Sequence, residues 1–255
     1  MSLLSLNGSQ HLYYELIAGD FRRPYLVFLH EGLGCSAMWK EFPYQLCQLT
    51  SCPGLLYDRL GYGKSSPLRE PRTITYVHDY ALIELPILLF RVIPETPFIL
   101  IGHSDGGSIG LIYGAQNPPQ LHGIIAEAAH IFVEPATLRG IRRADQQFDA
   151  GGFQGLYKYH GDKTRQLFKA WSETWLSEPF LSWNIENLLP SIVYPMLVLQ
   201  GTDDEYATNR QPEIICTKSA GPCTSCLIDQ CGHTPHKDRP DQVLQLMAQF
   251  IRTTM

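Results

Sequence analysis

Short apolar runs, each ended by a polar residue or a glycine, recur along the chain. Most are apolar at successive positions, which is typical of strands buried on both faces of a parallel sheet. Stretches of helical length with amphipathic spacing lie between them. The pattern therefore predicts an α/β fold in which a mostly parallel central sheet is flanked by helices. The predicted strands are a loosely alternating one at 11–17 and apolar runs at 24–29, 54–57, 97–101, 124–126, 196–199 and 226–228; the predicted helices are 76–90, 106–116 and 241–251.

Residues 132–190 contain no strand-like run. They carry helical patterns rich in arginine and glutamine and three of the four tryptophans. An all-helical insertion between two strands of such a sheet would cover the strand ends. We therefore expect a core of residues 1–131 and 191–255, with residues 132–190 inserted after the sixth strand as a helical cap. The alternative is that long helices simply continue the alternation of strand and helix.

Composition excludes several classes of protein. The 255 residues are 44% hydrophobic and only 18% charged, which predicts a large core and excludes intrinsic disorder. The net charge is −5 and no basic residues gather, so a nucleic-acid partner is not expected. No apolar run approaches the roughly 20 residues that span a bilayer, and the first residues lack the pattern of a secretion signal. We expect a soluble cytoplasmic protein with a small-molecule partner, and the sequence indicates no particular oligomeric state.

The cysteines do not form a metal-binding pattern. Cys223 and Cys226 have the spacing of a ligand pair, but no second pair stands at a matching distance among the seven cysteines. The sequence predicts no metal site, and reduced thiols are the expectation for a cytoplasmic protein.

The sharpest chemical signal lies at residues 99–107, where an apolar run leads through Gly102-His-Ser104-Asp-Gly106 into a helical pattern. This is the G-x-S-x-G turn between strand and helix that presents a nucleophilic serine. The glycines are required because a side chain at either position would collide with the neighbouring strand or helix. The alternative is an ordinary glycine-rich turn.

Partners for Ser104 follow in the chain. A serine nucleophile needs a histidine to take its proton and an acid to hold that histidine. One downstream strand ends at Asp203 and Asp204, and the next ends at Gly232-His233, so both late residues follow strand ends, where α/β sites assemble. Asp203 and His236 are the alternatives for acid and base.

Five ordered motifs together resemble the α/β-hydrolase superfamily: 29–34, 58–65, the serine turn, 201–204 and 232–233. The resemblance covers nearly the whole chain and implies an α/β-hydrolase fold with catalytic Ser104, Asp204 and His233. Asp204 is preferred over Asp203 because the acid of this family lies three residues past the glycine. No metal or organic cofactor is implied.

The resemblance also implies an oxyanion hole made of two backbone N–H groups. One belongs to Asp105 and the other to Gly32, with Leu33 as the alternative. Glu31 stands where the family commonly has glycine, which departs from the pattern. The superfamily often has a histidine at the position of His30, so a structural role is expected there, and His103 is expected to shape the pocket.

Asp105 bears on the substrate. Most relatives have an apolar residue directly after the nucleophile. The string 104–107 is similar to the biphenyl-hydrolase-like (valacyclovir hydrolase) type of α-amino-acid ester hydrolase, in which this aspartate binds the substrate ammonium. The alternative is a carboxylate that merely favours the helix N-terminus. Glu31 is expected to add a second carboxylate or to pair with an arginine, and Trp171 and Trp175 to line the pocket entrance.

The resulting hypothesis is a serine hydrolase that cleaves a small carboxylic ester, or an amino-acid ester or amide, through an acyl-enzyme. A hydrolase of carbon–carbon bonds is the first alternative. Its anionic substrate would need basic residues, for which Arg139, Arg142 and Arg143 are candidates unless they form a solvated helix face. A ligand receptor on a hydrolase scaffold is the second alternative, because fold does not prove function.

Overall fold

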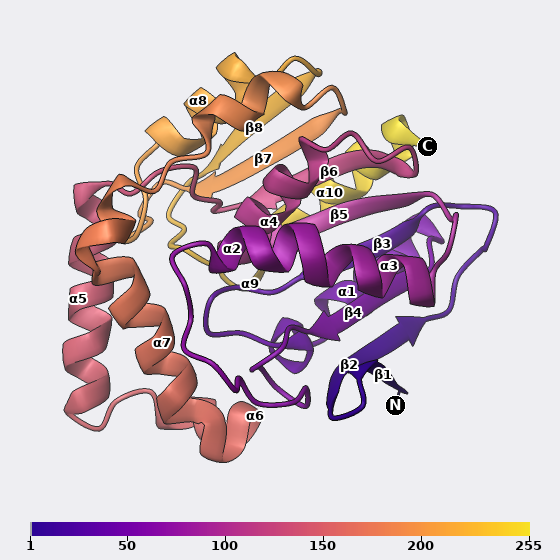
Figure 1. The fold of residues 1–255 in the computed structure, drawn as a ribbon. Coiled ribbons are helices and arrows are strands. Elements are labelled where there is room, and N and C mark those ends of the chain that lie inside the picture. The colour runs from indigo at the N-terminus through magenta and orange to yellow at the C-terminus, as the bar shows by residue number, and fades with distance from the viewer. Residues whose placement is uncertain (1) are drawn as a thin grey trace.

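The computed structural model describes residues 2–255 and has one eight-stranded sheet with the order β1-β2-β4-β3-β5-β6-β7-β8 (Figure 1). β1 and β2 pair antiparallel, β2 pairs antiparallel with β4, and all remaining pairs are parallel. This confirms the predicted mostly parallel sheet. The strands are β1 (Ser2–Asn7), β2 (Gln10–Ile17), β3 (Tyr25–Leu29), β4 (Gly54–Asp58), β5 (Phe98–His103), β6 (Leu121–Glu127), β7 (Met196–Gly201) and β8 (Cys223–Ile228).

Helices cover both faces of the sheet, which explains the continuous apolar runs. In β3, Val27 and Leu29 belong to one hydrophobic core, and Leu26 and Phe28 to the other. Successive side chains of a strand point to opposite faces, so a strand that is covered twice needs apolar residues at every position. One face carries α3 (Leu85–Val92), α4 (Asp105–Gly114) and α8 (Arg210–Lys218), and the other carries α1 (Phe42–Thr50) and α10 (Pro240–Thr254).

The helix predicted at 76–90 is interrupted. It consists of α2 (Tyr76–Asp79), a π-helical turn (Tyr80–Glu84) and α3. Pro86, near the start of α3, has no N–H to donate to the carbonyl four residues before it. A wider turn just before the proline accommodates this missing hydrogen bond.

Between β6 and β7 the chain forms only helices, 3-10 turns and one isolated bridge, from Phe132 to Asn184. The helices are α5 (Pro135–Asp149), α6 (Tyr157–His160) and α7 (Thr164–Leu176). α5 and α7 lie side by side at one end of the sheet (Figure 1) and pack through the stacked rings of Phe148 and Phe168. We call this segment between β6 and β7 the helical insertion. That residues 132–190 form a separate cap domain stays a prediction.

The expectation of reduced thiols is wrong for one pair of cysteines. Cys216, in α8, and Cys223, in β8, form a disulfide, with Cα atoms 5.1 Å apart. The pairing depends on how α8 returns to the edge of the sheet, which residue spacing does not show. Disulfides are uncommon in reducing compartments, so a cytoplasmic location stays a prediction. Among residues 2–255, no helix has the length and apolar character needed to cross a membrane.

Glu84, at the end of the π-helical turn, yields a prediction about stability. Its carboxylate accepts a hydrogen bond from the Leu60 N–H at 3.0 Å, and burial raises its pKa from 4.5 to about 8. The folded protein therefore binds a proton that the unfolded chain loses, and stability falls as pH rises from about 4.5 to about 8. The change Glu84→Gln keeps an acceptor but removes this titration.

We compare the free energy of unfolding of the Glu84→Gln variant with that of the wild type. As pH rises from 5 to 8, the difference should shift in favour of the variant by about 2 kcal/mol or more, since one pKa unit corresponds to about 1.4 kcal/mol. Urea unfolding at several pH values measures this difference. A difference that stays constant across the range contradicts the buried, protonated carboxyl.

Candidate active site

Ser104 occupies the turn between β5 and α4. Its backbone is in the left-handed region, with φ 53° and ψ −117°, which a non-glycine residue adopts only under constraint. One such constraint is a hydrogen bond to the neighbouring strand, from the Ser104 N–H to the carbonyl of Glu127 at the end of β6, at 2.8 Å. A Cβ at Gly102 would overlap the Gly106 backbone, and one at Gly106 would overlap the Leu29 carbonyl. The two glycines are therefore what lets the serine turn pack this tightly.

The structure brings Ser104, His233 and Asp204 together in one hydrogen-bonded chain. The Ser104 hydroxyl lies 2.9 Å from His233 Nε2, and His233 Nδ1 lies 2.8 Å from Asp204 Oδ2. Asp203 is exposed and makes no such contact within the described chain. His236 pairs instead with the buried Glu127, at 2.8 Å. Of the residues considered for acid and base, only Asp204 and His233 have the required geometry.

The surroundings of Asp204 keep it ionised and oriented. Its Oδ1 accepts the backbone N–H of Tyr206 at 2.8 Å and of Ala207 at 3.2 Å, and Oδ2 accepts the Gln200 side-chain amide. Burial alone would raise the pKa of Asp204, but the charge and hydrogen bond of His233 and the Tyr206 N–H outweigh burial and lower it. The carboxylate can thus hold His233 with its proton on Nδ1, leaving Nε2 free to take the serine proton.

The loop after β3, at residues 30–32, is held in place by side chains that donate hydrogen bonds to its backbone carbonyl groups. The buried Arg59 donates to the His30 carbonyl and, at 2.9 Å, to the Glu31 carbonyl. Tyr62 donates from its hydroxyl to the Gly32 carbonyl at 3.1 Å. Within residues 2–255, neither the Gly32 N–H nor the Asp105 N–H has a hydrogen-bond acceptor. Both groups are therefore free to donate to an oxyanion, which is the role that the resemblance implies for them.

His30 is part of this support. Its Nδ1 donates to the Glu31 carbonyl at 2.8 Å, and its Nε2 accepts the Arg59 N–H at 3.1 Å. Burial lowers the pKa of His30 well below its usual value, so the ring is neutral. These contacts agree with the structural role expected for His30.

Asp105 is buried and lines the cavity that contains Ser104. Its Oδ2 accepts the Tyr76 hydroxyl at 2.9 Å, and the Tyr76 oxygen in turn accepts the Trp175 indole N–H at 2.6 Å. The Arg59 guanidinium is 3.9 Å from the same carboxylate. An anion beside an oxyanion hole needs a compensating positive charge, and Arg59 supplies it. The sequence alone assigns no role to Arg59 or Tyr76, although Arg59 lies in the motif 58–65.

The carboxylate of Glu31 does not pair with an arginine. It lies 3.7 Å from His103 Nδ1 and 3.9 Å from Lys237 Nζ, so the expected arginine partner is wrong. Lys237 comes from α9 (Pro235–Asp238), whose approach to the β3 loop no local pattern indicates. Burial opposes ionisation of Glu31, but the nearby His103 and Lys237 hold its pKa well below the usual value.

The cavity around Ser104 has a volume of about 280 Å³, which suits a small substrate. The helical insertion supplies one wall, including the predicted Trp171 and Trp175. Among the described lining residues, three are carboxylic acids and none is arginine or lysine. His130 and Tyr206 were missed by the sequence analysis, because only the folded chain brings them beside His233. The lining residues are Glu31, Gly32, Leu33, Met38, His103, Ser104, Asp105, His130, Thr137, Ile141, Phe153, Leu156, Trp171, Trp175, Glu205, Tyr206, His233 and Thr234.

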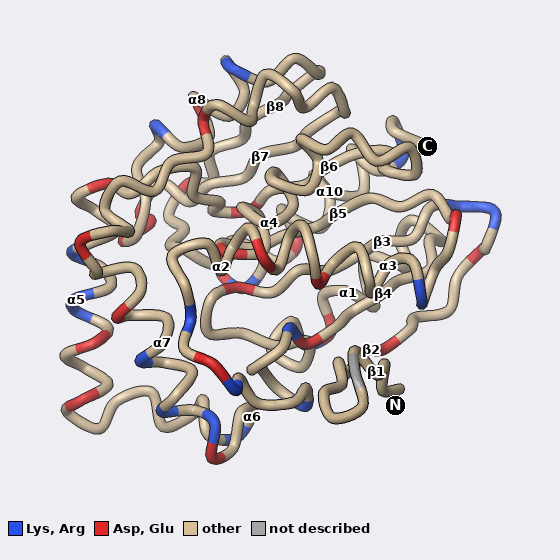
Figure 2. Tube along the Cα trace, in the orientation of Figure 1, with Lys and Arg blue, Asp and Glu red and all other residues tan. Residues whose placement is uncertain are grey.

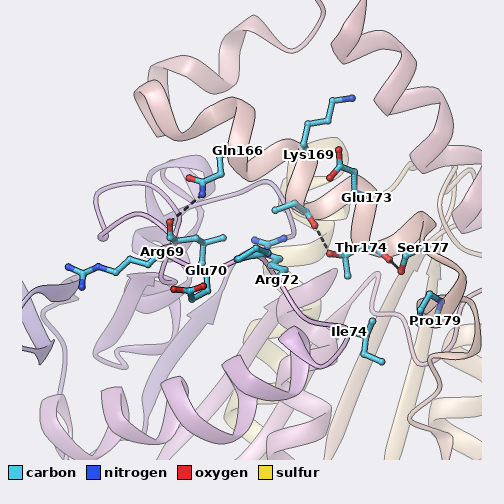
Figure 3. A pocket seen from close by; sticks show the side chains of 13 residues that line it. Arg69, Glu70, Arg72, Ile74, Gln166, Lys169, Glu173, Thr174, Ser177 and Pro179 are labelled. Carbon is cyan, nitrogen blue, oxygen red and sulfur yellow. Dashed lines mark hydrogen bonds between the residues drawn. The ribbon is translucent and has the colours of Figure 1, made fainter.

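A larger hollow of about 620 Å³ lies elsewhere, between residues 68–74 and α7 (Figure 3). No residue of the Ser104 chain lines it. Arg72, at its base, is stacked on Tyr62 and Tyr76 and donates to the Tyr62 hydroxyl. This hollow thus borders residues that support the Gly32 loop, but it contains no comparable chemistry.

Fold and site together define a hydrolase of the α/β class, and comparison with known proteins agrees. Residues 26–246 match the model of the Alpha/beta hydrolase family, so the chain belongs to this family. It is similar to a proline iminopeptidase of Saccharolobus solfataricus, with 23% identity over 94% of this chain and 89% of that protein. It is also similar to a 2-succinyl-6-hydroxy-2,4-cyclohexadiene-1-carboxylate synthase of Salmonella arizonae, with 22% identity over 94% and 99%.

Among solved structures, a 2-hydroxy-6-oxo-6-phenylhexa-2,4-dienoate hydrolase from Rhodococcus has a TM-score of 0.78. The two chains are 17% identical, and the match covers 96% of each. At this identity the likeness concerns the fold alone.

Proposed function

We propose that the protein is a serine hydrolase that cleaves small carboxylic esters through an acyl-enzyme. The observation that carries the proposal is the hydrogen-bonded chain Ser104–His233–Asp204 at the wall of a substrate-sized cavity. In this mechanism Ser104 Oγ attacks the ester carbonyl while His233 Nε2 takes the serine proton. Asp204 stabilises the imidazolium, and the N–H groups of Asp105 and Gly32 bind the oxyanion. His233 then protonates the departing alcohol and activates the water that releases the acid.

The charges in the cavity favour an acyl group with an ammonium. Glu31, Asp105 and Glu205 line the cavity together with no basic lysine or arginine among its described residues. Glu31 has a charged or basic partner on each oxygen, His103 on one and Lys237 on the other. In Asp105, Tyr76 and Arg59 both lie on Oδ2, and Oδ1 accepts no hydrogen bond from the described residues. We therefore propose that Asp105 holds the α-ammonium of an amino-acid ester or amide. The similarity to a proline iminopeptidase supports an amino-acid-derived substrate.

The same charges argue against carbon–carbon bond hydrolysis of an anionic substrate. Arg139, Arg142 and Arg143 are exposed, and none of them lines the Ser104 cavity. A carboxylate on the acyl part, inside the Ser104 cavity, would instead meet the side chains of Asp105 and Glu205. The receptor alternative is also disfavoured, because a binding module has no need of an aligned serine, histidine and aspartate.

The test of ammonium binding compares the p-nitrophenyl esters of alanine and of propionate, which differ by the amino group. We expect the wild type to prefer the alanine ester in kcat/KM, and Asp105→Asn to reduce that preference about 10- to 100-fold. A charge-assisted hydrogen bond is worth about 1.5–3 kcal/mol, which gives this range. Glu31→Gln serves as the control and should change the preference less, since its carboxylate is already paired. An unchanged ratio in Asp105→Asn contradicts ammonium binding but leaves the serine mechanism intact.

A panel of esters, thioesters, lactones, amides and one dienoic diketone tests the reaction class. Turnover of esters that disappears in Ser104→Ala supports the proposal. Turnover of the dienoic diketone in preference to every ester contradicts it.

A further inference from the structure

A second cavity adjoins the one that contains Ser104. It has a volume of about 500 Å³ and lies between α5 and the loop after β7. Phe153, Glu205 and Tyr206 line both cavities, so the two share a wall. The Tyr206 ring is also 4.8 Å from the His233 ring. The second cavity thus borders the Ser104 cavity on the side of His233, the residue that protonates the leaving group.

The second cavity differs from the first in charge. Arg139 and Arg143 line it, and Glu205 is its single acidic residue among those described. The two arginines are four residues apart on α5 and therefore lie on the same helix face. Within residues 2–255, neither guanidinium has a hydrogen bond or an ion pair. Figure 2 shows basic positions along the first part of α5 and acidic positions at its end.

The backbone of α5 packs closely against this wall. A Cβ at Gly140 would lie 2.7 Å from Tyr206 Cδ1 and 2.9 Å from the Glu205 carbonyl oxygen, so glycine is what allows the approach. Burial raises the pKa of Tyr206, and the nearby Arg143 charge opposes that rise. The backbone of α5 is thus fixed beside Tyr206, a neighbour of the catalytic histidine, and Arg139 and Arg143 extend from this helix to line the cavity.

We infer that the second cavity is a leaving-group subsite that binds a carboxylate through Arg139 and Arg143. This inference rests on the proposed function. Together the two cavities suit a zwitterionic substrate: an ammonium on the acyl part, near Asp105, and a carboxylate on the leaving part, near α5. When the acyl–oxygen bond breaks and the Ser104–acyl bond forms, His233 returns its proton to the leaving oxygen. The product that leaves through this subsite is a hydroxy acid, or an amino acid when the substrate is an amide.

The test uses two alanine esters, one of glycolic acid and one of glycolamide. They share the acyl group and nearly the same shape, and differ in the leaving group's negative charge. We expect the wild type to favour the glycolic acid ester about five- to tenfold in kcat/KM. The double variant Arg139→Gln, Arg143→Gln should lose this preference. Arg142→Gln is the matched control, because Arg142 is exposed on the same helix but does not line the cavity, and it should keep the preference.

Equal kcat/KM for the two esters in the wild type, or a preference that survives in the double variant, overturns the inference. The result is separate from the proposed function, which is tested by turnover of the glycolamide ester, whose leaving group carries no charge. If neither ester turns over, binding of each ester to Ser104→Ala, measured by the change in tryptophan fluorescence, tests the carboxylate subsite. Tighter binding of the glycolic acid ester that depends on Arg139 and Arg143 supports the subsite, and equal binding of the two esters rejects it.

Discussion

Ser104→Ala is expected to lower kcat for a small ester by about 10⁴-fold or more, with little change in KM. Removing the nucleophile of a serine triad abolishes the covalent route, while the oxyanion hole and binding leave a small residual rate. The Ser104 hydroxyl is 2.9 Å from His233 Nε2, and within residues 2–255 no other serine hydroxyl has a hydrogen bond to His233. Steady-state hydrolysis of an activated ester measures the effect.

Ser108→Ala is a suitable control for this variant. Ser108 is also buried in α4, but its hydroxyl donates to the His130 carbonyl at 2.6 Å and to the Ser104 carbonyl at 3.4 Å, and it has no hydrogen bond to His233 within residues 2–255. We expect kcat to stay within about tenfold of the wild type, a loss of at most about 1.4 kcal/mol. Equal losses in the two variants would point to damaged folding and not to loss of a nucleophile.

Asp204→Asn is expected to lower kcat by about 10⁴-fold at neutral pH. The N–H groups of Tyr206 and Ala207 both point at Asp204 Oδ1, so the oxygen of an asparagine would stay there. Its amide would then face His233 Nδ1 and act as a donor. His233 would carry its proton on Nε2 and could no longer accept the proton of Ser104.

The matched control is Asp203→Asn, which removes the neighbouring exposed carboxylate. Because Asp203 makes no side-chain contact with His233, kcat should remain close to that of the wild type. A large loss in Asp203→Asn together with a small loss in Asp204→Asn would reverse the assignment of the acid.

The sequence predicted those features that depend on short stretches of chain. The parallel sheet followed from runs such as 24–29, whose alternate side chains enter two separate cores. The serine turn followed from Gly102 and Gly106, which are needed for close packing at that turn. His233 and the pair Asp203 and Asp204 followed from their position after strand ends, where neighbouring parallel strands place their loops together. The resemblance to the α/β-hydrolase superfamily then selected Asp204.

Features that depend on the direction of distant side chains were not predicted. Arg59 reaches from the loop after β4 to the carbonyls of the β3 loop and to Asp105, and Tyr76 reaches Asp105 from α2. The partners of Glu31 were not predicted for the same reason: they are His103 and Lys237, and not an arginine. The same reason applies to the disulfide between Cys216 and Cys223. Each depends on the packing of separate elements, for which the spacing of residues along the chain carries no information.

The central claim is that Ser104 is a nucleophile activated by His233. A fluorophosphonate probe tests it most directly, because it reacts with an activated serine whatever the natural substrate is. After incubation of the purified wild type, mass spectrometry should show one added phosphonyl group, located on the peptide that contains Ser104. Ser104→Ala should show no addition, and His233→Gln should react far more slowly. Absence of labelling in the folded wild type, or equal labelling of Ser104→Ala, would contradict the claim.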